Sequence, residues 1–188
     1  FEIWRSNNFD GTGFALYDTT SDYFYTDIGA LADSNNYTYV VRSQGDTTNS
    51  NMGFKLVKTL VDNSLANNWI SLPYKCDITT ADELMDDINA DGPGGDAVSI
   101  ATRWDTGNQI FQSRIDTGAS RFGVNFAIVP GVGYQVKMIQ NINWKLVGAS
   151  QDMFTEVTIN LVDNSLAANW IALPYNSALL TADDVMDA

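Results

Sequence analysis

The chain of 188 residues is acidic, with 10 lysine and arginine residues against 23 aspartate and glutamate residues and a formal net charge of −13. This charge repels phosphate backbones and anionic lipid headgroups, and no apolar run approaches the roughly 20 residues of a membrane helix, so we expect no nucleic-acid partner and no membrane insertion. The chain has a single cysteine, Cys76, which excludes an internal disulfide. It has no histidine, which is the commonest general base and metal ligand in proteins. We therefore expect a protein that is not an enzyme and that holds no metal or cofactor.

The first fifty residues alternate short β-like runs with turn signals. Asp10 and Gly11 form a dipeptide that is typical of a tight turn between strands. Further along, Leu31 stands six residues ahead of Tyr37, which opens an alternating strand over residues 37–43. Earlier β-like runs cover residues 1–5, 14–17 and 22–26.

This arrangement resembles a fibronectin type III domain over residues 1–50, and the opening Phe-Glu-Ile-Trp-Arg is similar to the third strand of that family. The resemblance implies that Leu31 caps the core, that Tyr37 makes the corner hydrogen bond to the preceding loop, and that Tyr39 and Val41 point inward. The first two strands of such a sandwich would precede the chain. We therefore expect them to belong to a longer polypeptide, or to be supplied by a neighbouring copy through strand complementation.

A long internal repeat organises the remainder of the chain. Residues 60–74 return at residues 161–175, an offset of 101 with only two substitutions in fifteen positions, and the copies stay aligned through residues 80–86 and 181–187. A period near one hundred residues fits tandem domains that each have a core of their own. The chain is thus expected to contain a partial fibronectin type III-like sandwich over residues 1–50, a complete repeat domain over 52–147, and the first part of a second copy over 148–188.

Within the complete repeat, the pattern predicts several strands and one short helix. Thr80 and Glu83 have the spacing of a capping box, which predicts a helix over residues 81–88. Strands are expected over residues 54–60, 69–74, 98–104, 109–115, 125–128 and 134–138. The fold class is therefore mainly β, with antiparallel, β-sandwich-like tandem domains and one short helix per repeat.

A second resemblance rests on a series of short motifs. It is carried by Asn-Trp-Ile-Ser-Leu-Pro at residues 68–73, Thr-Ala-Asp-Glu-Leu at 80–84, Arg-Trp-Asp at 103–105, Gln-Ile-Phe-Gln-Ser at 109–113 and Pro-Gly-Val-Gly-Tyr at 130–134. This series resembles a module that stands beside fibronectin type III domains in large secreted or surface proteins of bacteria and archaea. That module has no assigned catalytic residues, so the resemblance implies an accessory or structural domain.

Acidic residues near the predicted helix are expected to have ordinary structural roles. Asp82, Glu83, Asp86 and Asp87 should form its solvated face, and the first two are favoured by the positive end of the helix dipole. The loop over residues 91–96 has two carboxylates but lacks the ligand spacing of a calcium loop, so we expect a plain turn.

Tryptophans suggest a second kind of function. Trp69 and its equivalent Trp170 lie in alternating apolar segments, and we expect both in the core. Trp104 lies between Arg103 and Asp105 at a strand end. It is the candidate for sugar stacking, because an exposed indole face suits the apolar side of a pyranose ring.

The leading hypothesis is a non-catalytic, extracellular or cell-surface repeat module with a structural or adhesive role in a large surface, filament or matrix protein. Its partners would be neighbouring domains or copies of the same protein. The alternative is a carbohydrate-binding accessory module of a secreted polysaccharide-degrading enzyme, with glycans as partners. Asn36, in the sequon Asn-Tyr-Thr, is a candidate site of glycan attachment on a surface loop.

Overall fold

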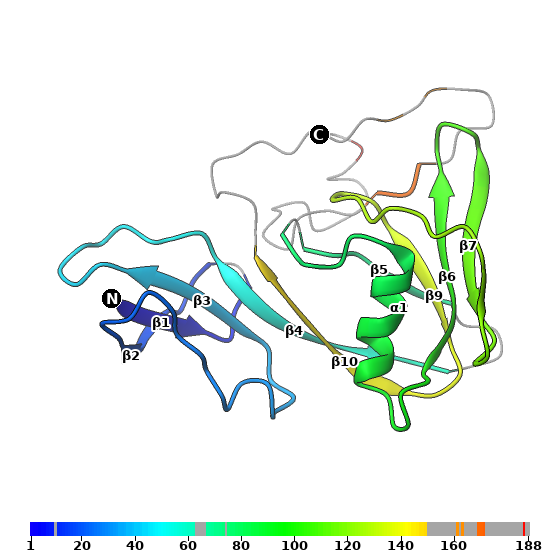
Figure 1. Ribbon diagram of the computed structural model, residues 1–188. Helices are drawn as coiled ribbons and strands as arrows, with labels where there is room; N and C mark the ends of the chain where they lie inside the picture. The colour runs from blue at the N-terminus through cyan, green and yellow to red at the C-terminus, as the bar shows by residue number, and fades with distance from the viewer. Residues whose placement is uncertain are drawn as a thin grey trace.

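The computed structural model describes residues 1–9, 11–62, 67–73, 75–149, 161, 163, 169–171 and 186. Over these residues the fold is mainly β and resembles a sandwich, as the sequence pattern predicts (Figure 1). The strands of this part of the chain form two antiparallel five-stranded sheets, in the orders β10-β4-β3-β1-β2 and β5-β9-β6-β7-β8, and they are accompanied by one helix, α1. The predicted second-copy helix and the expected turn at Asp10 fall largely outside the described residues.

The first sheet contains strands from both sides of the boundary predicted near residue 51. β3 pairs with β4, which in turn pairs with β10 over its whole length, from Ile142 opposite Leu60 to Ala149 opposite Gly53. The sheet therefore continues from the first fifty residues into the repeat. Its strands are β1 (Glu2–Ser6), β2 (Ala15–Thr19), β3 (Tyr37–Arg42), β4 (Gly53–Leu60) and β10 (Ile142–Ala149).

The second sheet contains β5 (Asn68–Ile70), β6 (Val98–Asp105), β7 (Ile110–Asp116), β8 (Arg121–Gly123) and β9 (Tyr134–Met138). The expected strand over residues 125–128 is wrong, since Ala127 forms only an isolated bridge with Thr80. At the end of β8, Gly123 has a φ of 83°, and a Cβ there would lie 2.2 Å from the carbonyl oxygen of Ser113. Only glycine allows β8 to approach β7 this closely.

The helix α1 (Ala81–Ala90) begins at the predicted capping box. The backbone N–H of Glu83 donates to Thr80 Oγ1 at 3.3 Å, and the Glu83 carboxylate accepts from the backbone N–H of Thr80 at 3.1 Å. The apolar stripe of Leu84, Met85 and Ile88 is fully buried. Spacing of three and four residues places this stripe on one face of the helix.

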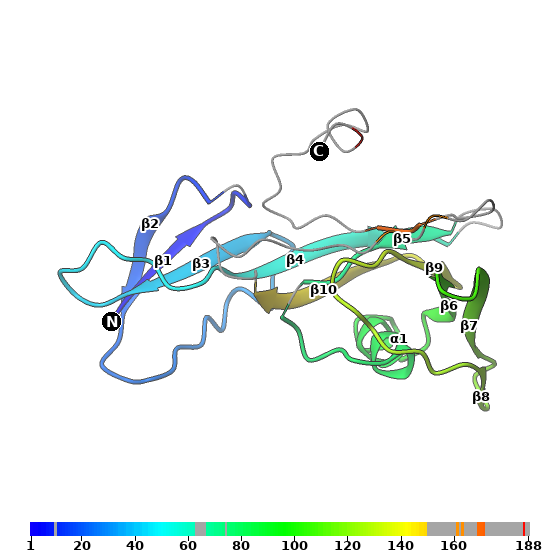
Figure 2. The ribbon, with the colours of Figure 1, turned by 90° about the horizontal axis from the view of Figure 1, so that it is seen from above.

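The core lies where α1 packs between the two sheets. Figure 2 shows α1 on one side of the long β4–β10 pair and beside β6. Trp144 and Leu146 of β10 and Val136 of β9 close the core around the helix, with each of them at most 1% exposed. Ile142, Trp144 and Leu146 recur at every second position, as expected for a strand with one buried face.

In the first fifty residues, two positions differ from the expected fibronectin-like pattern. Leu31 is 55% exposed and does not cap a core, and Val41 is 37% exposed although it shares a face of the sheet with the buried Ile3. Tyr37 is buried as expected, and its hydroxyl donates to the side chain of Asp33 in the preceding loop. Residues 25–27, 30 and 31 of the loop over residues 22–33 lie over this face and line a pocket there with Ile3 and Val41.

Two aspartates fasten this loop to the sheet. Asp27 accepts from Arg5 Nη1 at 2.9 Å and from the Tyr39 hydroxyl at 2.8 Å. Asp33 accepts from Nζ of the buried Lys55 at 2.9 Å, and this ammonium also donates to backbone carbonyls of the loop. The hydrogen bonds from Tyr37 and Lys55 hold the pKa of Asp33 well below its usual value, so the carboxylate stays charged at neutral pH.

Candidate functional site

Four aromatic side chains meet on the second sheet, on the face opposite the core. Trp104 of β6 lies directly across from Phe111 of β7, with ring centroids 4.8 Å apart. Trp69 of β5 and Trp170 of the second copy complete the group, with centroids 4.3 Å apart and planes at 68°. We call these four residues the aromatic cluster.

Strand periodicity explains which face carries the cluster. Ile70 of β5 pairs with Tyr134, and both are buried in the core, so the preceding residue Trp69 must point the other way. Trp69 is 52% exposed, which makes the expectation of a core position wrong. Phe111, on the same face, is 60% exposed.

Trp170 brings the second copy into contact with the first. Its ring lies 6.5 Å from that of Trp104 in a stacked arrangement and 5.4 Å from that of Phe111. The next residue, Ile171, forms an antiparallel bridge with Val132. The segment 169–171 therefore makes both side-chain and main-chain contacts with the first copy.

Gly133 lies beside this segment. A Cβ at Gly133 would lie 3.4 Å from the carbonyl oxygen of Ile171 and 3.9 Å from Cβ of Trp170. Both distances are those of ordinary van der Waals contact, so residue 133 packs directly against the segment 169–171. The Pro-Gly-Val-Gly-Tyr motif at residues 130–134 thus borders the aromatic cluster.

Trp104, the candidate for sugar stacking, is half-buried within the cluster. Phe111 packs against it in an edge-on arrangement and Trp170 stacks beside it. Its Nε1 is buried and has no hydrogen-bond partner in the part of the chain that the structure describes. Aromatic side chains therefore occupy much of the surface that a sugar ring would need.

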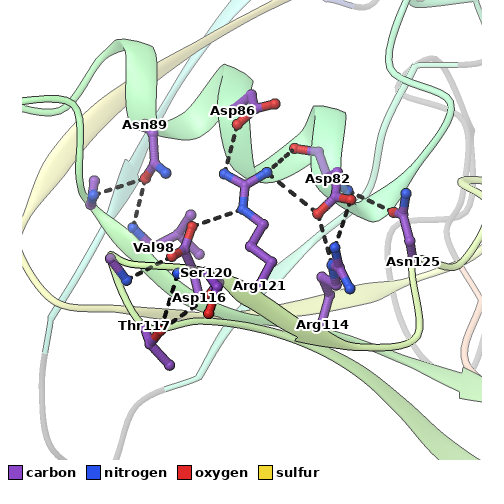
Figure 3. A network of polar contacts seen from close by, with 12 residues as sticks. Asp82, Asp86, Asn89, Val98, Arg114, Asp116, Thr117, Ser120, Arg121 and Asn125 are labelled. Atoms are coloured by element: carbon purple, nitrogen blue, oxygen red, sulfur yellow. Dashed lines mark hydrogen bonds and ion pairs between the residues drawn. The ribbon is translucent and has the colours of Figure 1, made fainter.

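Of the four acidic residues expected on a solvated face of α1, Glu83 and Asp86 are exposed, whereas Asp82 and Asp87 are half-buried. Asp82 receives two parallel hydrogen bonds from Arg114, at 2.8 and 3.0 Å, and also contacts Arg121 (Figure 3). Asp86 accepts from Arg121 Nη2 at 2.6 Å, and the Asp87 carboxylate accepts from the indole N–H of Trp144 at 2.7 Å. These contacts span 32 to 57 residues in sequence, which explains why local spacing could not reveal them.

Arg121 is the centre of this network. Its Nε donates to Asp116 at 2.7 Å, while its two terminal nitrogens reach Asp82 and Asp86 on α1 (Figure 3). Hydrogen bonds from Arg114 and Arg121 lower the pKa of Asp82, and those from Arg121 and Gly118 lower the pKa of Asp116. Burial instead raises the pKa of Asp87. The network ties the helix to the β7–β8 hairpin.

Side-chain hydrogen bonds also hold the loop over residues 91–96 in place. Asp91 accepts from the backbone N–H of Lys145 at 2.7 Å, and Gln140 donates to backbone carbonyls of Pro93 and Asp96. An open polar cavity of about 500 Å³ lies between this loop, α1 and the β7–β8 turn. Within the described residues, no group of three or more His, Cys, Asp and Glu side chains is placed to hold a metal ion.

Asn36, the candidate site of glycan attachment, contacts the neighbouring strand. Its side-chain oxygen accepts from the backbone N–H of Val57 on β4 at 2.7 Å, and the residue is partly buried. Its carboxamide thus helps to hold the loop before β3 against β4.

Comparisons with known proteins do not place the chain in a family. None of the described helices is long and apolar enough to cross a membrane. Scans against protein-family models, curated proteins and solved structures all found no match.

Proposed function

We propose that the chain is a non-catalytic, extracellular or cell-surface repeat module with a structural or adhesive role in a large surface, filament or matrix protein. The observation that carries the proposal is the contact between copies, in which Trp170 of the second packs on Trp69 of the first. Two copies of one sequence that touch through an equivalent residue suit an extended assembly of repeats. The acidic composition suits a module that stays soluble among many identical neighbours.

The organisation proposed for such a parent protein follows the repeat. Residues 52–147 are one unit, residues 148–188 begin the next, and residues 1–50 belong to a preceding fibronectin type III-like part. β2 supports an additional role for neighbouring copies, because all five of its residues are exposed and it forms one edge of the first sheet. Such an edge can accept a strand from another molecule.

Surface labelling tests this proposal. Antibodies raised against the folded chain should label intact, unpermeabilised cells of the source, or the matrix around them, and should detect a polypeptide much larger than 20.6 kDa in the same fraction. Labelling that appears only after permeabilisation would contradict an extracellular role.

A carbohydrate-binding accessory module is the second candidate, and the exposure of neighbouring Trp69 and Phe111 favours it. Titration with a panel of soluble glycans should then produce a saturable shift in tryptophan emission that the W69A substitution abolishes. Trp4 is the control position, since its indole N–H donates to Glu2 on the first sheet, remote from the cluster. An emission spectrum unmoved by every glycan would remove this candidate.

A further inference from the structure

We infer that the aromatic cluster is a joint in which one repeat receives the Asn-Trp-Ile segment of the repeat that follows it. This inference rests on the proposed tandem array and names the surface that joins its units. The receiving surface consists of Trp69, Trp104, Phe111 and residues 132–133, and the occupant is the segment 169–171 of the next copy.

Main-chain contacts fix the position of the incoming segment. The bridge between Val132 and Ile171 sets its register against the residues just before β9. Gly133 lies directly against the carbonyl of Ile171 and the Cβ of Trp170. Backbone pairing of this kind fixes both the direction and the register of a segment, whereas a contact made by side chains alone does not.

Side-chain contacts supply the attraction. Trp170 touches three aromatic rings of the first copy, at centroid distances of 4.3, 5.4 and 6.5 Å. Aromatic pairs in these ranges add stabilisation beyond the burial of their area. The four cluster residues carry no charge, so charge screening by sodium chloride should not weaken the joint.

The joint links equivalent positions of successive repeats. Trp69 and Trp170 occupy the same place in the duplicated segment, and they contact each other directly. In the first copy this position belongs to the receiving surface, and in the second copy it is the incoming residue. A third copy could dock on the second in the same way, which would hold the units at a fixed spacing rather than as independent beads.

Disulfide trapping in the full chain tests the joint. Residues opposite each other in an antiparallel pair have Cα atoms about 4.5–5.5 Å apart, within the range that a disulfide spans. With Cys76 replaced by serine, the V132C/I171C pair should cross-link under mild oxidation at least tenfold faster than V124C/I171C. Val124 is a suitable control because it is exposed and follows β8, where its N–H donates to Ser113.

Substitutions of Trp170 test whether its side chain holds the segment 169–171 against the first copy. In the V132C/I171C background, W170A should slow cross-linking at least tenfold, whereas W170F should retain most of the rate. Circular dichroism should show that W170A leaves the fold of the first repeat intact. Equal cross-linking rates for the two cysteine pairs, or a W170A rate equal to that of the parent pair, would overturn the inference.

The cross-linking result and the surface-labelling result can fail independently of each other. A joint that forms as described in a protein found only inside cells would contradict the proposed location and leave the joint standing. A surface protein whose cysteine pair does not cross-link preferentially would contradict the joint alone.

Discussion

Replacing Arg121 with methionine should destabilise the fold by about 2–3 kcal/mol, because the guanidinium joins α1 to the β7–β8 hairpin. Only 18% of the Arg121 side chain is exposed, and its partner Asp116 is 14% exposed, so loss of the cation leaves a poorly solvated carboxylate. Its contact with Asp86 adds little to this figure, because the Asp86 side chain is 68% exposed and water screens the pair.

Urea denaturation at pH 7, followed by circular dichroism, measures this effect. The matched control is D86N, which removes the negative charge from the exposed contact and should cost no more than about 0.5 kcal/mol. The double variant R121M/D116N should recover part of the loss, because the stranded carboxylate is gone. If R121M proved no more destabilising than D86N, the Arg121 network would not contribute to the unfolding free energy, and the reasoning above would be refuted.

Three further predictions concern the helix, the core and pH. T80A should lower the unfolding free energy by about 1 kcal/mol through loss of the capping hydroxyl, as measured by urea denaturation. M85A, at a fully buried position, should cost about 2–5 kcal/mol, whereas L31A at an exposed position should cost less than about 0.5 kcal/mol, and equal effects would contradict the assigned core. The lowered pKa values of Asp82 and Asp116 contribute stability that is present above the unfolded-state value near 3.9 and is lost as pH falls through their folded values. The melting temperature of the wild type should therefore fall more steeply below about pH 4.5 than that of R121M, and parallel curves would exclude this linkage.

Local patterns predicted the elements whose formation depends on near neighbours. The capping box at Thr80 and the alternation that forms β4, β6, β7 and β9 lie in short windows of sequence, and the structure confirms them. The period-two pattern of Ile142, Trp144 and Leu146 carried the same signal for β10, which sequence reasoning missed. β8 has three residues and ends in Gly123, so it gave no comparable signal.

The candidate site depends on arrangement in space, which the sequence did not reveal. Trp69 is apolar and duplicated, both of which favour a core position, but β5 buries Ile70 and turns Trp69 outward. The sequence around Asp82 indicates a surface residue, but in the fold the β7–β8 hairpin places Arg114 and Arg121 beside it. In both cases a partner distant in sequence decides the role of the residue.

The pairing of β4 with β10 determines how a repeat would respond to a pull. Gly53, where β4 begins, lies opposite Ala149, where β10 ends. Tension applied at these two points would peel the strands apart one hydrogen bond at a time instead of shearing the whole ladder at once. In the folded state the two points are only about 5 Å apart, and complete unravelling of roughly 100 residues would release on the order of 300 Å of chain. Under such a pull, the segment from Gly53 to Ala149 would lengthen at low force, and the hydrogen bonds of Arg121 between α1 and the β7–β8 hairpin would resist the later stages.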